Sequence, residues 1–266
     1  ADQDIAWFLL SPAGMAALVL LAGLTIAILG FEQASLMTMG AGHPQGLHIS
    51  TPAALRFTAV RAPSIFAFAI RLVIRVLLLT LPFIAASGAI AWFLLSAYDI
   101  NYYLAEQPAE FWIAAVMIVL LLLAMLLILL SRLLAWTMAL PLVLFARVTP
   151  AKSFAESERL TRGHKRRLLK MLALWGLLTL LFSTVVLGMV QLLGSWLVPG
   201  FYDSIDWLVP VLGGLAALWI LGNFVVTVFA AGSLAYVLVG FYQQYGAAEA
   251  HTDLTAIAQL QPASGW

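Results

Sequence analysis

The side chains best suited to chemistry in this sequence are arginines and lysines, and the chemistry that they suit is phosphate binding. Cations at a membrane surface attract anionic head groups by about 1 kcal/mol each. Six of them gather near the ends of two apolar segments: Arg132, Arg159, Arg162, Lys165, Arg166 and Arg167. We interpret these six as contacts for anionic lipid or for a phosphorylated ligand. The alternative is that their charge only anchors the neighbouring segments.

The spacing of the cations adds two expectations. By their spacing, Arg159, Arg162 and Arg166 are predicted to fall on one helical face. Arg132 interrupts a long apolar run, where a charge costs roughly 2.5–3.5 kcal/mol at mid-bilayer. It therefore needs a lipid phosphate, an ion-pair partner within a helix bundle, or a place at the inner interface. In the last case, residues 133–146 would lie along the membrane.

A short polar segment with two aromatic rings follows one apolar run. It contains Asp99, Asn101, Tyr102 and Tyr103. Tyrosine prefers the interface between membrane and water, so part of an aromatic belt outside the membrane is one interpretation. A tightly folded outside cap, which closes the bundle or binds a ligand, is the other.

No catalytic residue and no metal site are predicted. Cysteine is absent, and His43 and His48 have no carboxylate or thiol beside them to complete a metal site. Asp203 and Asp206 are typical of an outside loop. Phosphate-binding glycine loops are missing, and the basic runs flank apolar segments, so we expect no cofactor in this chain and no nucleic-acid partner.

The elements that must position these residues are membrane-spanning helices. Of the 266 residues, 64% are hydrophobic and 9% are charged, whereas soluble domains are about 45–50% apolar and about 25% charged. Runs of about 20 apolar residues cross a bilayer as helices. Five such spans are predicted, at residues 5–31, 72–98, 111–141, 168–198 and 207–241. We expect an all-α, polytopic integral membrane helix bundle over residues 1–250, then a polar cytoplasmic tail over 251–266.

The distribution of charge predicts the orientation of the bundle. All 13 Lys and Arg residues lie within 56–75 and 132–170, whereas the connections 99–110 and 199–206 carry carboxylates and no cation. By the positive-inside rule, the basic stretches and the C-terminus are cytoplasmic. The N-terminus is then outside, which favours a further span before Ala1.

A repeated tripeptide predicts two cytoplasmic interfacial elbow helices. Thr51-Pro52-Ala53 and Thr149-Pro150-Ala151 each place a capping threonine before a proline suited to the first helical position. Each is followed by a basic segment, a span, an acidic loop and a returning span. We interpret this order as an internal repeat of about one hundred residues, with chance recurrence of a common tripeptide as the alternative.

Three segments resemble the membrane domain of bacterial glycerophosphodiester phosphodiesterases. They are Asp99 to Pro108 with its Asn-Tyr-Tyr-Leu core and the following Glu110-Phe111-Trp112, then Ser157 to His164, and the opening Asp2-Gln3-Asp4-Ile5 with Phe8 to Pro12. In that family a cytoplasmic TIM-barrel domain usually follows. It uses a divalent metal to hydrolyse glycerophosphodiesters to glycerol 3-phosphate and an alcohol. The His-Arg-Gly signature of that catalytic domain does not occur in this sequence, so no catalytic role is carried over.

The resemblance implies a multi-pass domain of the bacterial inner membrane. Such a domain would anchor, and present lipid-derived phosphodiesters to, a C-terminal catalytic domain of the same polypeptide. Residues 251–266 would begin the linker, and anionic lipids would be its other partners. The alternative is a stand-alone protein of transporter or assembly-factor type, so the sequence leaves open whether the chain is part of an enzyme.

Overall fold

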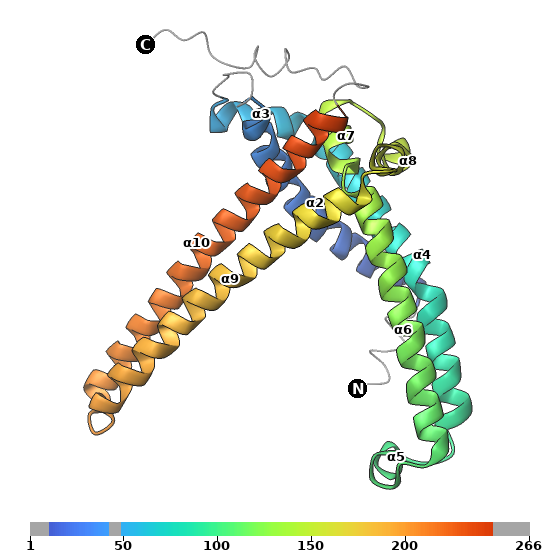
Figure 1. Cartoon of the computed structure of the whole chain (residues 1–266), viewed down its shortest axis with the longest axis vertical. Helices are drawn as coiled ribbons and strands as arrows, with labels where there is room; N and C mark the ends of the chain where they lie inside the picture. Colours follow the sequence, from blue (N-terminus) through green and yellow to red (C-terminus); the bar gives the residue numbers. More distant parts are fainter. Residues whose placement is uncertain (1–10, 43–48, 247–266) are drawn as a thin grey trace. The chain divides into compact units, whose positions relative to one another are not determined.

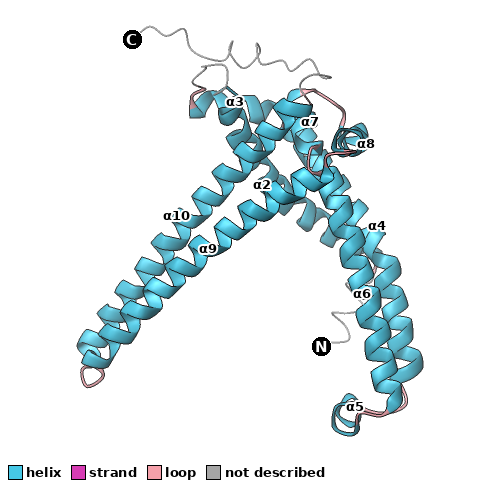
Figure 2. Ribbon diagram, in the orientation of Figure 1, coloured by secondary structure: helices cyan, strands magenta, loops and turns pink. Residues whose placement is uncertain are grey.

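A computed structural model describes residues 11–42 and 49–246, and these form an all-α protein (Figures 1 and 2). No strand occurs within the described residues. The five long helices are α2 (Pro12–Gly42), α4 (Ala62–Leu95), α6 (Ala109–Trp136), α9 (Lys165–Leu197) and α10 (Ile205–Tyr245). The short elements are α3 (Thr51–Val60), α5 (Ile100–Glu106), α7 (Ala139–Phe145), α8 (Pro150–Thr161) and the 3₁₀ turn η2 (Val198–Phe201).

Five helical segments are long and apolar enough to span a membrane, with α6 and α7 counted as one segment, Ala109–Phe145. The expected all-α polytopic membrane bundle is therefore confirmed. Several helices extend beyond the predicted spans. For example, α2 continues from the predicted end at residue 31 to Gly42. Hydropathy marks the part of a helix that suits lipid, whereas backbone hydrogen bonding continues into more polar sequence. Residues 5–10 of the first predicted span lie outside the described residues.

The chain forms two compact units. Unit 1 comprises Ala1–Phe31 and Ala59–Arg162, and unit 2 comprises Glu32–Thr58 and Gly163–Trp266. In unit 1, α4 and α6 pack against each other as a hairpin joined through α5. In unit 2, α9 and α10 pack in the same way through η2. The order of short helix, long helix, connection and long helix thus occurs twice, as the predicted repeat requires.

The two threonines do not cap the elbow helices as predicted. Thr51 is itself the first residue of α3, and its hydroxyl contacts Met39 Sδ at 3.8 Å. Thr149 does precede α8 in an extended conformation, with Pro150 in the first turn, but its side chain makes no capping bond. Its carbonyl accepts instead from Lys152 N–H at 2.9 Å and Ser153 N–H at 3.0 Å. The proline was thus the informative residue, because its fixed φ suits the first helical turn.

An aromatic cluster attaches α8 to the α4–α6 hairpin within unit 1. The Phe154 ring is fully buried and stacks on Phe68, with ring centroids 5.2 Å apart. Trp136 meets the same ring edge-on at 5.6 Å. The Arg75 guanidinium lies over it at 4.4 Å, in cation–π geometry. Phe154 therefore joins α8 to both helices of the hairpin.

Ser157 holds the junction where the third predicted span breaks. Helix α6 ends at Trp136 and α7 begins at Ala139, which leaves backbone groups that a continuous helix would pair. The buried Ser157 hydroxyl donates to Ala135 O at 2.6 Å and accepts from Met138 N–H at 3.1 Å. One side chain of α8 therefore satisfies two backbone groups of the break.

Replacing Ser157 with alanine is expected to lower the free energy of unfolding by about 1–3 kcal/mol, because Met138 N–H would remain buried without a partner. Equilibrium unfolding in a denaturing detergent measures the change. Ser195→Ala is the control, since the exposed Ser195 hydroxyl donates to Leu192 O within its own helix at 2.8 Å. Equal stability of the two variants would contradict the assigned role.

Candidate functional site

Arg132 has an ion-pair partner. Its Nη1 lies 3.2 Å from Glu158 Oε1, which joins the end of α6 to α8 within unit 1. The two side chains are 48% and 37% exposed, so the pair lies at a surface and not in the interior of a bundle. The sequence predicted that Arg132, within an apolar run, needs a partner for its charge. Glu158 is that partner. The contact of Arg132 with lipid stays a prediction.

The prediction that Arg159, Arg162 and Arg166 share one helical face is wrong. Helix α8 ends at Thr161 and α9 begins at Lys165. Between them Gly163 adopts a φ of +88°, a conformation open to glycine because it lacks a Cβ. Arg159 and Arg166 therefore belong to different helices. Arg159 forms an ion pair with Glu156 at 3.1 Å, one turn earlier in α8.

The first turn of α9 gathers polar contacts within unit 2. Arg167 Nη1 donates to the Tyr245 hydroxyl at 2.7 Å. The His164 ring lies against the same tyrosine, with centroids 4.2 Å apart. The end of α10 is thereby tied to the start of α9. Arg166 is exposed and Lys165 is partly exposed, so both are accessible to an anionic surface.

The connection between α4 and α6 folds into an aromatic cluster. The Tyr98 and Tyr102 rings lie 4.4 Å apart, and Tyr103 meets Tyr102 edge-on at 5.6 Å. Tyr103 is only 4% exposed. Asn101 Nδ2 donates to Asp99 Oδ2 at 2.9 Å. The four predicted residues therefore belong to one compact connection, to which the structure adds Tyr98; binding of a ligand by it stays a prediction.

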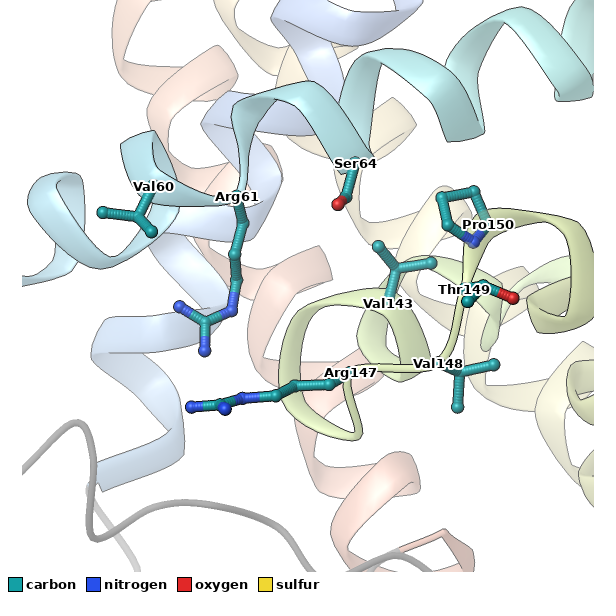
Figure 3. A pocket seen from close by; sticks show the side chains of 8 residues that line it. All are labelled: Val60, Arg61, Ser64, Val143, Arg147, Val148, Thr149 and Pro150. Carbon is teal, nitrogen blue, oxygen red and sulfur yellow. The ribbon is translucent and has the colours of Figure 1, made fainter.

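A pocket that the sequence did not predict lies between the start of α4 and the α7–α8 connection, entirely within unit 1. Its volume is about 440 Å³. Figure 3 shows the Arg61 and Arg147 side chains extending to the same side of it. Its lining consists of Val60, Arg61, Ser64, Val143, Arg147, Val148, Thr149 and Pro150. Two arginines, Ser64 and several apolar side chains thus line one site.

The backbone at Arg147 is unusual. Its φ is +51°, in the left-handed region that side chains other than glycine seldom adopt. The turn is closed by Ala146 N–H and Val148 N–H, which both donate to Leu142 O, at 3.1 and 3.3 Å. This turn ends α7 and directs the Arg147 side chain to the pocket. Arg61 and Arg147 served only as topology signals in the sequence, because neither a positive φ nor their proximity could be read from it.

Metal ligands do not cluster in the described part of the chain, where no group of three His, Cys, Asp or Glu side chains converges. His43 and His48 lie outside the described residues. Asp203 and Asp206 flank the start of α10, beside η2.

Comparison with known proteins identifies one family. The family described as "Membrane domain of glycerophosphoryl diester phosphodiesterase" matches residues 1–256. No curated protein and no solved structure matches the chain. The family resemblance noted in the sequence is therefore confirmed over nearly the whole chain.

Proposed function

The chain belongs to the family of glycerophosphoryl diester phosphodiesterase membrane domains, and from this we propose that it anchors a phosphodiesterase and presents lipid-derived phosphodiesters to it. The hydrolytic domain would follow the tail at residues 251–266 in the same polypeptide. Any divalent metal would be held there, since no convergent ligand set occurs in the described residues here. The chain's own work is anchoring and presentation.

The arrangement of charge along each hairpin carries this proposal. In unit 1, Arg71 and Arg75 lie in the first half of α4 and Arg132 lies near the end of α6, whereas the acidic connection that contains α5 joins the opposite ends of these helices (Figure 1). In unit 2, the cations stand at the start of α9, and Asp203 and Asp206 stand beside η2. Each hairpin is therefore basic at one end and acidic at the other.

This polarity supports an orientation with the elbow helices on the cytoplasmic side of a bacterial inner membrane. The C-terminal end of α10 would then lie on the same side as the basic residues, where a soluble catalytic domain could follow. The six predicted cations Arg132, Arg159, Arg162, Lys165, Arg166 and Arg167 would attract anionic lipid toward that domain.

Antibodies against this chain test the proposal in native membranes. We expect them to detect a species well above 28.8 kDa, larger by the size of a barrel domain, and to deplete glycerophosphodiester hydrolysis from solubilised membranes. Antibodies against an unrelated membrane protein are the control and should deplete nothing. A species near 28.8 kDa with no loss of hydrolysis would favour a stand-alone transporter or assembly factor and reject the enzymatic context.

A further inference from the structure

We propose that the pocket lined by Arg61 and Arg147 binds the phosphodiester group of a glycerophospholipid head group or of the free diester released from one. The ligand class rests on the proposed function, whereas the site rests on the geometry within unit 1. None of the residues that line this pocket is among the six cations predicted from the sequence.

The two arginines supply the recognition. A guanidinium can donate two parallel hydrogen bonds to phosphate oxygens, and its charge shortens and strengthens those bonds. Arg61 approaches from the turn before α4 and Arg147 from the turn after α7, and both guanidinium groups end on the same side of the pocket (Figure 3). Two separate turns of the backbone therefore each place one positively charged group beside the pocket.

Two helix starts add to the positive potential. Arg61 directly precedes α4 and Thr149 directly precedes α8, and both residues line the pocket, so both helices begin beside it. The start of a helix carries a partial positive charge, which favours a bound anion. Ser64 lines the same pocket, and its hydroxyl can donate to a phosphate oxygen.

The apolar residues that line the pocket bear on which chemical groups the bound phosphate carries. Val60, Val143, Val148 and Pro150 form apolar walls beside the cations. Pockets of about 300–1,000 Å³ suit small organic ligands, and a volume of about 440 Å³ leaves room beyond a single phosphate group. The pocket thus has room for a phosphodiester with a glycerol attached, whose carbon atoms can contact the apolar walls.

The backbone at Arg147 provides a variant that separates binding from folding. Glycine adopts a φ of +51° without steric cost, so Arg147→Gly removes the guanidinium and leaves the turn intact. Arg61→Gln removes the other charge. Arg71→Gln is the matched control, because Arg71 is exposed on α4 and donates to Ala67 O of its own helix at 3.0 Å.

Two probes distinguish the source of the phosphodiester. The chain in nanodiscs of phosphatidylcholine with a minor share of phosphatidylglycerol is analysed by native mass spectrometry. In detergent, it is titrated with the soluble diester glycerophosphoglycerol by calorimetry. We expect Arg61→Gln and Arg147→Gly each to weaken binding about tenfold and the double variant to abolish it, with Arg71→Gln unchanged. Retained phosphatidylglycerol without calorimetric binding assigns the site to the lipid, and calorimetric binding assigns it to the free diester.

The proposal is overturned if the wild-type chain binds neither probe, or if the double variant binds like Arg71→Gln. A purely structural role for the arginines would lower the melting temperature without a selective loss of phosphodiester binding, and it would equally overturn the proposal. These binding measurements use this chain without a catalytic domain. Their result is therefore valid even if the antibody experiment shows that the chain is not part of a phosphodiesterase. Conversely, binding can be absent although the chain is part of such an enzyme.

Discussion

Replacing Phe154 with alanine is expected to lower the free energy of unfolding by about 3–5 kcal/mol. The ring is fully buried, and it contacts Phe68 of α4, Trp136 of α6 and the guanidinium of Arg75. Truncation removes these contacts and leaves a cavity that the rigid helix backbones can fill only in part. It also deprives the Arg75 charge of one of the two rings over which it lies.

Unfolding in a denaturing detergent at equilibrium, with the chain's intrinsic fluorescence as the signal, measures this change. The matched control is Phe93→Ala on α4, because Phe93 is 82% exposed in the structure. Its effect is expected to stay within about 0.5 kcal/mol. If Phe154→Ala were as mild as the control, α8 would not be held to the hairpin through this ring.

Replacing Gly222 with alanine is expected to destabilise the α9–α10 hairpin by about 1–3 kcal/mol. A Cβ at this position would lie 2.5 Å from Cγ1 of Val186, which is too close for two carbon atoms. The valine cannot turn away easily, because its branched side chain has one strongly preferred rotamer in a helix. The helices would have to separate locally, with loss of the packing on which association of helices in lipid depends.

Gly214→Ala in the same helix is the control for this effect. A Cβ there has no atom within 4 Å, so the change should be neutral or should stabilise the helix by up to about 1 kcal/mol. The double variant Gly222→Ala with Val186→Ala should recover part of the stability, since the clashing methyl groups are gone. Detergent unfolding curves of these three variants check the series, and a Gly222→Ala variant as stable as Gly214→Ala would contradict the close approach.

Those parts of the fold were predictable that depend on the sequence of one continuous segment. Long apolar runs report membrane helices directly, and the recurring Thr-Pro pair marked the elbow helices. The break between α6 and α7 has a local cause, because Pro141 lacks an N–H and its ring crowds the carbonyl of Thr137, four residues earlier. What could not be predicted is that Ser157, in a different helix, satisfies backbone groups at the break. The single face expected for Arg159 and Arg166 failed because the φ of Gly163 interrupts the helix between them.

The candidate sites likewise differ in how far apart their residues lie in the sequence, and so in whether they could be predicted. Asn101 and Tyr102 could be grouped from the sequence because they are neighbours in one short connection. Arg61 and Arg147 could not be grouped, since they are far apart in the chain and meet only when α8 and α7 pack near the start of α4. Nothing in the local sequence signals that Arg147 adopts a positive φ, a conformation in which glycine is the usual residue.

The interleaved assignment of the chain to two units has a consequence for biosynthesis. Unit 1 contains Ala1–Phe31 and Ala59–Arg162, so all of its residues have been synthesised once Arg162 has left the ribosome. Unit 2 joins Glu32–Thr58 to Gly163–Trp266. The earlier of these segments must therefore wait, while more than a hundred intervening residues are translated, for the partner that completes its packing. Packing of the second unit can therefore be completed only after synthesis of Gly163–Trp266 has begun.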